Sequence, residues 1–514
     1  MARQLDIRLT GVAAALDALR TQVERAAEWS RRTGDVAIAL GTARGDGPLN
    51  LAGTAVACRA VIPRWYARHA DAGRAWLGVG EAVEASAGDA GTLADLAPVM
   101  DRWRPRVVAE DPSAVRWLGG AAFDAGPRRA AWRGWPRAKM WLPRVTFSQR
   151  GDRWTITVAA VVRPGQSAID AWADAAQWCE AHLRSEAPVE STPYARRGAG
   201  AGSDAGAENR AGVLREAGGL RDEGVLREAG RRVEGLAAPD ARRRWERLVT
   251  QTAGMLRAGR LEKVVLAREE VTPLPNPDVG AALDRLARWY PASTVFAVWH
   301  EDSCFLGATP ERLVSVRAGE VAADCLAGTA PRGETPEEDE RIARWLLTSR
   351  KNLHEHAVVR EWLRDRLAPL CEALTIAPEP ALKRLANVQH LYTPITGRLG
   401  GGTGILAVAS ALLPTPALAG SPQQEAMAYI RAVEGFDRGW YGGAVGWAGW
   451  DGDGAFSVAI RCALLRGGMA HLYAGAGIVA DSDPAAEWEE TVLKLRPMRH
   501  ALLWREGDLD DGES

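Results

Sequence analysis

Two carboxylates and an amine share one face of a helix predicted near the end of the chain. Glu487, Glu490 and Lys494 are spaced three and four positions apart, which aligns their side chains on an α-helix. The simplest interpretation is a solvated face with a Glu490–Lys494 ion pair. The functional alternative is a face that meets a ligand, because these charges would be costly to bury without partners.

The segment before that helix favours the functional alternative. A strand is predicted to end near Tyr473, and residues 474–478 (AGAGI) are predicted to form a glycine turn whose backbone N–H groups can bind an anion. Asp483 is a suitable N-cap, and Pro497 is predicted to end the helix. The glycines also match a loose dinucleotide-binding pattern, but no acidic residue lies at 495–500, about 20 positions on, so nucleotide binding is not expected.

The composition indicates an ordinary globular protein without a preference for polyanions. The 514 residues are 47% hydrophobic and 25% charged, with a formal net charge of -1, so neither nucleic acid nor an anionic membrane is an expected partner. No apolar run is long enough for a membrane span, and no signal peptide is recognisable. Six widely spaced cysteines without a CxxC motif fit a reduced, cytoplasmic protein.

The chain divides into four stretches. Residues 1–186 mix helical and strand patterns without a catalytic constellation and are expected to be an α+β scaffold, part of a composite fold. Residues 187–238 are rich in Ala, Gly, Arg and Glu, contain two copies of a 12-residue repeat, and are expected to be a flexible insertion or linker. Residues 239–505 hold the motifs and are the expected catalytic region, and residues 506–514 form an acidic tail.

Two residues of the catalytic region have the chemistry of a base and an acid. Lys263 lies in a predicted strand, on the same face as Val265 and Ala267. An apolar setting would favour the neutral amine that a general base needs, although an edge-strand lysine that deters aggregation is an equal alternative. Glu311 lies between a Gly/Pro turn and an apolar strand, which suits a carboxyl with a raised pKa that acts as an acid; an ion pair with a nearby arginine is the alternative.

A further carboxylate lies on another helix, predicted from Thr335 toward Leu367. Glu355 stands between two histidines there, but the HExxH pattern is absent and histidines two positions apart point in different directions, so a zinc site is rejected. Glu355, Glu487 and Glu490 together form an all-oxygen ligand set on two helices, which suits Mg²⁺.

Ten short motifs follow one another along the catalytic region. They are 261–268 (LEKVVLAR), 306–311 (LGATPE), 326–333 (LAGTAPRG), 349–356 (SRKNLHEH), 388–391 (VQHL), 413–416 (LPTP), 441–446 (YGGAVG), 460–461 (IR), 474–478 (AGAGI) and 487–494 (EWEETVLK). This ordered set resembles the chorismate-utilising enzymes, and most of all the isochorismate synthases of the menaquinone branch. The resemblance is close over residues 240–500 and looser over 1–186.

The resemblance implies a fold and a catalytic machinery. The fold would be α+β, of the anthranilate synthase component I type, with antiparallel β-sheets surrounded by helices and the site in the cleft between them. Lys263 matches the base that activates water to attack C2 of chorismate, and Glu311 matches the acid that protonates the departing C4 hydroxyl. Glu355 and Glu490 match direct Mg²⁺ ligands, and Glu487 a helper acting through water; the metal would bind the ring carboxylate.

Other matched positions are implied to bind the substrate or line the site. They are Gly328, Thr329, His390, Thr415, Tyr441, Arg461, Gly475, Gly477 and Lys494, with the last two glycines offering backbone N–H groups.

Three positions separate the branches of the family, and a fourth departs from the family pattern. Lys263 stands where the aminating relatives have Gln, and a lysine base fits water rather than ammonia. Ala327 stands where relatives that form a covalent intermediate have lysine. Asn352 is familiar among isochorismate synthases, whereas Leu413 replaces a histidine found in many relatives, so no role of that imidazole carries over.

The expected function is therefore Mg²⁺-dependent isomerisation of chorismate to isochorismate, in menaquinone biosynthesis. The alternatives are a siderophore-pathway isochorismate synthase, a salicylate synthase that also expels pyruvate, and a catalytically silent chorismate-binding member. A glutaminase subunit is not expected, and a cytoplasmic monomer or weak homodimer is.

Overall fold

The computed structural model describes ten stretches of the chain: residues 2–58, 61, 63–69, 73–87, 91–112, 115–124, 130–183, 238–259, 261–384 and 388–503. The expected insertion, apart from Ala238, and the acidic tail lie outside the described residues.

Within the described residues the strands form two sheets, antiparallel apart from one parallel pair at the edge of the larger sheet. The twelve-stranded sheet runs in the order β18 (Gly420–Ser421), β10 (Lys263–Pro273), β22 (Met469–Ile478), β21 (Cys462–Arg466), β12 (Ser303–Thr309), β11 (Thr294–His300), β2 (Arg64–His69), β3 (Arg74–Val79), β8 (Val145–Arg150), β9 (Arg153–Val162), β1 (Ala37–Asp46) and β5 (Val107–Ala109). The ten-stranded sheet runs β15 (Cys371–Ile376), β17 (Val388–Leu399), β14 (Glu320–Pro331), β13 (Arg312–Arg317), β20 (Gly454–Val458), β19 (Ala444–Ala448), β6 (Trp117–Ala121), β7 (Ala138–Leu142) and β4 (Val83–Ala87), with β16 (Ala381–Arg384) paired to β17.

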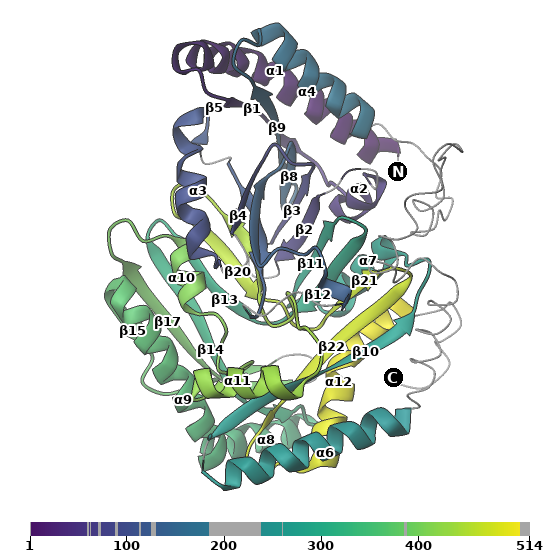
Figure 1. Ribbon diagram of the computed structural model, residues 1–514, viewed down its shortest axis with the longest axis vertical. Helices are drawn as coiled ribbons and strands as arrows, with labels where there is room; N and C mark the ends of the chain where they lie inside the picture. Colours follow the sequence, from purple (N-terminus) through teal and green to yellow (C-terminus); the bar gives the residue numbers. More distant parts are fainter. Residues whose placement is uncertain are drawn as a thin grey trace, which may run out of the picture.

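Helices cover these sheets. In Figure 1, α1 (Ala2–Thr33) and α4 (Ala168–Leu183) lie side by side at one end of the molecule, where both pack against β9. The other α-helices of the described residues are α2 (Leu51–Ala57), α3 (Ala97–Asp101), α6 (Ala238–Arg257), α7 (Val279–Trp289), α8 (Pro336–Thr348), α9 (Arg350–Leu367), α10 (Ile405–Ala411), α11 (Gln423–Val433) and α12 (Pro484–Leu503). None of the helices in the described ranges is long and apolar enough to cross a membrane. The α+β class is confirmed.

Both sheets combine strands from before and after the stretch 184–237. In the larger sheet β2 pairs with β11, and in the smaller sheet β6 pairs with β19. The two parts of the chain are therefore joined through continuous hydrogen-bonded sheets.

Alternation along the strands builds two cores. In β1, Ala37 and Ala39 belong to the core between the larger sheet and its helices, whereas Ile38 and Leu40 belong to the core that includes residues of both sheets. Successive side chains of a strand point to opposite faces, so a strand covered on both faces is apolar throughout.

Three local expectations are wrong. The helix predicted from Thr335 is broken at Ser349, which is the C-cap of α8 and the N-cap of α9; its hydroxyl accepts a hydrogen bond from the Asn352 side chain at 2.8 Å. Serine favours such caps because its hydroxyl substitutes for missing helix bonds. The predicted glycine turn at 474–478 is instead the end of β22, paired with β10 along its length.

Pro497 does not end the last helix, because α12 continues to Leu503. Proline removes one helix hydrogen bond and costs about 3 kcal/mol in a helix interior. The bond lost is the one to the carbonyl of Leu493, a residue that is 63% exposed, so water can replace the missing N–H donor. The turns beyond the proline are retained because Met498 and Ala501 are buried in the core under the larger sheet.

A buried ion pair completes the edge of β10. The strand β18 pairs only with Lys263 and Val264. Beyond that point Glu434 accepts a hydrogen bond from the Ala267 N–H at 2.8 Å, and Arg438 donates to the Val265 carbonyl at 2.7 Å. The two side chains also bond each other, and each is only 3% exposed. Side chains thus replace a neighbouring strand along this part of β10.

We predict that Glu434→Ala lowers the free energy of unfolding by about 3–5 kcal/mol, because it leaves the Arg438 guanidinium buried without its partner. Urea denaturation of both variants is the measurement. The matched control is Glu361→Ala, which breaks the half-exposed pair with Arg364 and should cost less than about 1 kcal/mol. Equal costs for the two variants would contradict this account of the pair.

Candidate active site

The floor of the candidate site is the β10–β22 pair. Gly475 lies opposite Ala267 and Gly477 opposite Val265. The N–H groups of Val265 and Ala267 bond to Ala419 and Glu434, on the other side of β10. These are therefore non-hydrogen-bonded pairs, and the N–H groups of both glycines point away from β10. Because β21 pairs with β22 only as far as Leu472, they point to an open stretch of strand edge.

The side chains of Lys263 and Tyr441, both predicted site residues, lie directly over these glycines. A Cβ atom at Gly477 would lie 2.7 Å from Cε and 3.3 Å from Nζ of Lys263. A Cβ atom at Gly475 would lie 2.9 Å from the hydroxyl of Tyr441. Any larger residue would displace the lysine or the tyrosine, so both positions require glycine for close approach.

Tyr441 is held rigidly with its hydroxyl toward this floor. It is 2% exposed, and its ring stacks on Tyr473 with centroids 5.3 Å apart. Burial raises the pKa of the Tyr441 phenol, so the hydroxyl stays protonated and available as a hydrogen-bond donor.

Arg461 brings a guanidinium to the same place from a strained turn. It lies between β20 and β21 with φ +49°, a left-handed conformation unusual for arginine. The turn is fixed because the Arg461 carbonyl accepts a hydrogen bond from Ala308 at 3.1 Å. Among the described residues the half-buried guanidinium has no hydrogen-bond or ion-pair partner. Strain of this kind with an unpaired cation indicates a binding group.

Lys494 reaches the floor from α12. Its Nζ donates to the Gly475 carbonyl at 2.8 Å and to Glu490 Oε1 at 2.5 Å. Burial lowers the pKa of Lys494, while Glu490 opposes that shift. The amine is thereby fixed beside Arg461, whose charge also acts on it. The two cations form a site suited to a carboxylate.

Glu311 lies beside these cations, between β12 and β13. Burial raises its pKa to about 7, although Arg461 and Lys494 pull in the opposite direction. Its backbone is fixed on both sides, since its N–H bonds Thr309 Oγ1 at 3.2 Å and its carbonyl accepts from Val458 at 3.0 Å. A carboxyl whose pKa is about 7 is partly protonated at neutral pH, so it can donate a proton from this position.

A bulge in the smaller sheet supplies a further wall. The β14–β17 register shifts between Leu326 and Thr329, and Gly328 has φ +79° there. Thr329 Oγ1 lies 2.9 Å from Nδ1 of His390 across the strands. Burial, with Arg461 as the next largest cause, lowers the pKa of His390 to about 4, so the imidazole is neutral at pH 7.

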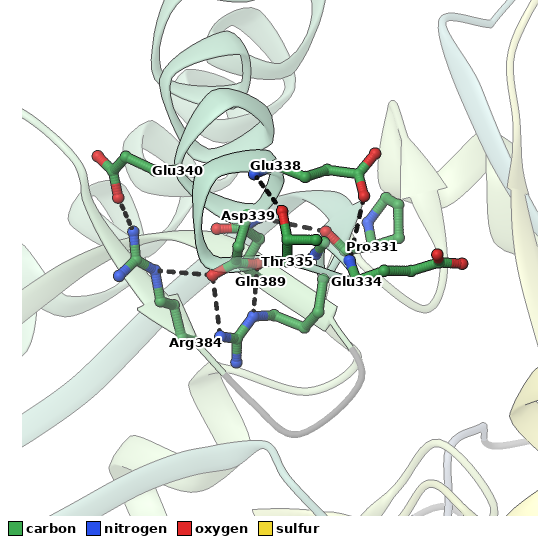
Figure 2. A network of polar contacts seen from close by, with 10 residues as sticks. Pro331, Glu334, Thr335, Glu338, Asp339, Glu340, Arg384 and Gln389 are labelled. Atoms are coloured by element: carbon green, nitrogen blue, oxygen red, sulfur yellow. Dashed lines mark hydrogen bonds and ion pairs between the residues drawn. The ribbon is translucent and has the colours of Figure 1, made fainter. Parts of the chain in front are cut away.

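Figure 2 shows how the end of β14 after this bulge is anchored. Asp339 accepts hydrogen bonds from Arg332 at 2.7 and 2.9 Å and from the Gly333 N–H at 2.9 Å. These bonds lower the pKa of Asp339 to about 2. Gln389 donates to the Pro331 carbonyl at 3.2 Å. The network ties α8 to β14 and β17, and so holds the strands that form the bulge.

The three candidate metal ligands differ in their surroundings. Glu490 bonds Lys494, and Glu487 Oε1 accepts a hydrogen bond from Ser482 at 2.7 Å. Glu355 on α9 is half-buried, and its carboxylate has no hydrogen-bond or ion-pair partner among the described residues. It lies one turn after Asn352, whose Cβ would be 3.2 Å from a Cβ at Gly328, so it shares the face that meets the bulge.

This donor set fits Mg²⁺ in its chemistry, since all three are carboxylates and Glu355 is unpaired. No three His, Cys, Asp or Glu side chains within the described ranges lie close enough together to bind a metal by themselves. A cation here would therefore need water and substrate oxygens as well. The histidines of the region are not ligands of this kind: His354 is exposed, whereas His356 is buried with Nε2 2.7 Å from Thr393 Oγ1 and Nδ1 3.2 Å from the Ala327 carbonyl.

Thr415, a predicted site residue, and Leu413, which replaces a histidine of many relatives, lie outside this cluster. Thr415 is buried, and its hydroxyl has no partner among the described residues, but no recorded contact joins it to the cationic pair. Leu413 lines a separate cavity between α11 and β6.

Glu434, Arg438 and Asp339 position the site and do not stand out from sequence. A Glu and an Arg four residues apart, as at 434 and 438, are a weak signal, because such pairs are common on solvated helices. Only the fold reveals that this pair is buried.

Comparison with known proteins identifies the family of the chain. The model of the family described as chorismate binding enzyme matches residues 51–199 and 228–503. The chain is 41% identical over 411 residues to the salicylate biosynthesis isochorismate synthase of Pseudomonas aeruginosa, covering 79% of each chain. It is 40% identical over 259 residues to isochorismate synthase MenF of Bacillus subtilis, covering 50% of this chain and 55% of that protein.

Solved structures identify the fold of the chain. MenF, the menaquinone-specific isochorismate synthase from Escherichia coli, is similar with a TM-score of 0.70 at 23% identity, covering 94% of this chain and all of that one. Anthranilate synthase component I from Streptococcus pneumoniae is similar with a TM-score of 0.55 at 21% identity, covering 76% and 81%. The expected component I-type fold is confirmed. The chain belongs to the chorismate-binding enzymes and, within them, to the isochorismate synthases.

Proposed function

We propose that Lys263 and Glu311 perform an Mg²⁺-dependent isomerisation of chorismate to isochorismate. The observation that supports this most is the placement of Glu311, with a pKa of about 7, beside two cations over the same strand pair that Lys263 covers. A dianionic substrate bound there meets a proton donor and an amine base together.

The substrate carboxylates are assigned to the positively charged edge of the floor. The Arg461 guanidinium and the Lys494 amine supply charge, and the N–H groups of Gly475 and Gly477 supply neutral donors. Charge-assisted bonds to a carboxylate are stronger than neutral ones, so these groups fix the ring against the floor. The Tyr441 hydroxyl adds a donor above Gly475.

In the reaction, Lys263 takes a proton from water as the water oxygen bonds to C2. The ring double bonds shift, and the C4–oxygen bond breaks while Glu311 gives its proton to the departing hydroxyl, which leaves as water. One water is consumed and one released, so the product is an isomer. Lys263 and Glu311 then exchange their protons with solvent, which restores the starting state.

Mg²⁺ bound by Glu355 and Glu490, with Glu487 through water, would neutralise the ring carboxylate and orient it. The unpaired Glu355 carboxylate supports this assignment. The proposed enzyme is cytoplasmic and acts as a monomer or weak homodimer without a glutaminase subunit. The proposed reaction adds water and not ammonia.

For the product we propose use in menaquinone biosynthesis, because the similar E. coli protein MenF is named a menaquinone-specific isochorismate synthase and the Bacillus relative is also named MenF. The alternative is supply of isochorismate for salicylate, because the P. aeruginosa relative that aligns over 79% of the chain is named for that pathway.

Product analysis tests the proposed function. Purified protein incubated with chorismate and Mg²⁺ should form isochorismate without pyruvate, and EDTA should abolish the reaction until Mg²⁺ is restored. Glu355→Ala should raise the Mg²⁺ concentration needed for half-maximal rate by about tenfold or more, since one of few ligands is lost. Release of pyruvate would assign the protein to the salicylate synthases, and binding of chorismate without turnover would make it a silent member.

Substitution of the proposed base and acid should separate catalysis from folding. Lys263→Ala and Glu311→Gln are each expected to lower kcat by about 10²–10⁴-fold, the usual contribution of a positioned proton-transfer group. Glu372→Gln, at an exposed position on β15, is the control and should retain full activity. Unfolding midpoints measured alongside should agree for all three; near-normal turnover in either active-site variant would reject its role.

The pH dependence of kcat/KM follows from Glu311. The acid works only when protonated, whereas the base Lys263 works only as the neutral amine and has the opposite pH dependence. Glu311→Gln keeps the base and removes the titrating acid, so the ratio of wild-type to Glu311→Gln kcat/KM should fall as pH rises through about 7, the pKa of this carboxyl in the free enzyme. Steady-state rates from pH 6 to 9 at constant ionic strength measure the descending limb. A wild-type to Glu311→Gln ratio that stays level up to pH 9 would exclude Glu311 as the proton donor.

A further inference from the structure

A second cluster of charge lies far from the site, on the face of the larger sheet that packs toward the smaller one. Four adjacent strands, β3, β8, β9 and β1, change there from apolar to polar residues near their ends. In β1 the change comes after Ile38 and Leu40, which belong to the core between the sheets, and Arg44 follows on the same face. Four strands separate β3 from β22, so this region is remote from the β10–β22 floor.

The cluster contains three arginines in one cross-strand row. Arg74 lies directly opposite Arg150, and Arg150 lies directly opposite Arg153. Like charges in such positions are destabilising. None of the three guanidiniums has a hydrogen-bond or ion-pair partner among the described residues. Burial, together with the charges of Arg150, Arg317 and Arg116, lowers the pKa of Arg74.

The next row supplies hydrogen-bonding and aromatic groups. Trp76, Ser148, Thr155 and Arg44 follow one another across the same four strands. Arg44 is already held by Asp111 at 2.5 Å. Trp76 is anchored beneath, since its ring contacts Trp447 of β19 with centroids 5.6 Å apart. The hydroxyls of Ser148 and Thr155 thus lie in the row next to the three arginines. The indole of Trp76 in the same row is held in place by Trp447.

The two rows line a cavity of about 560 Å³. The opposite wall includes Arg116, which lies between the sheets with its guanidinium 4.7 Å above the Trp447 ring. Five arginines and two aspartates line the cavity, so positive charge is in excess. The volume is in the range of small-molecule sites.

We propose that this cavity is a second anion-binding site, for a small organic molecule with two or three carboxylate or phosphate groups. The arginine row provides planar donors for bidentate bonds to such groups. The serine and threonine hydroxyls bind the remaining oxygens, and the bound anion removes the repulsion between adjacent guanidiniums. The proposal does not depend on the assignment of catalytic roles.

Calorimetric titration of the full chain tests this site, without Mg²⁺ and at low ionic strength. Citrate and pyrophosphate are the probes, so that the two arms distinguish carboxylate from phosphate. Arg150→Thr should weaken binding of the preferred probe by about tenfold or more, because a charge-assisted contact is lost. The variant should fold, since it removes the central one of three adjacent like charges and threonine suits a strand.

Two further variants decide where the probe binds. Arg398→Thr removes one exposed arginine from β17 of the other sheet and should bind as the wild type does. Arg461→Ala removes one of the two cations of the proposed active site and should also leave binding of the probe intact. The preferred probe should raise the unfolding midpoint of the wild type and not that of Arg150→Thr. No binding of either probe, unchanged affinity in Arg150→Thr, or loss of binding in Arg461→Ala would overturn the proposal.

Discussion

The proposed active site depends on a strand whose edge is completed by a buried ion pair. β10 presents Lys263 and the residues opposite the two site glycines, yet only two of its residues pair with β18. Glu434 and Arg438 take over from there and satisfy the backbone groups of Val265 and Ala267. A buried N–H or carbonyl without a partner would be costly, so the ion pair fixes which face of β10 lies toward the proposed site.

The electrostatics of the candidate site follow from one cation, the Arg461 guanidinium, that has no ion-pair partner among the described residues. Most arginines of the described chain bond a carboxylate or a carbonyl, but the half-buried Arg461 bonds neither and is held in place by its backbone. Burial also raises the pKa of Glu311, which lies beside this cation. One partly buried pocket therefore brings together a candidate anion-binding group and a candidate acid.

Much of the fold and site can be predicted from sequence, because the relevant signals are local. The β-branched run of β10 and the Asp483 N-cap are set by short-range patterns and occur as expected. Residues 474–478 form a strand because they pair with β10, which lies about 200 residues away in the sequence. Their glycine content is a local signal, and it gives the wrong prediction of a turn. Pro497 misleads for a similar reason, since burial of the last turns of α12 outweighs a local breaker.

The pairing of early with late strands also constrains how the chain is made. β2 ends at His69, but its partner β11 begins only at Thr294. At roughly 5–20 residues per second, the ribosome needs ten seconds or more to supply that partner. During this interval the nascent chain holds the edges of β2 and β6 open, and exposed edges of this kind invite pairing with other chains. Synthesis of this enzyme thus contains a waiting period in which a chaperone that shields strand edges would protect it.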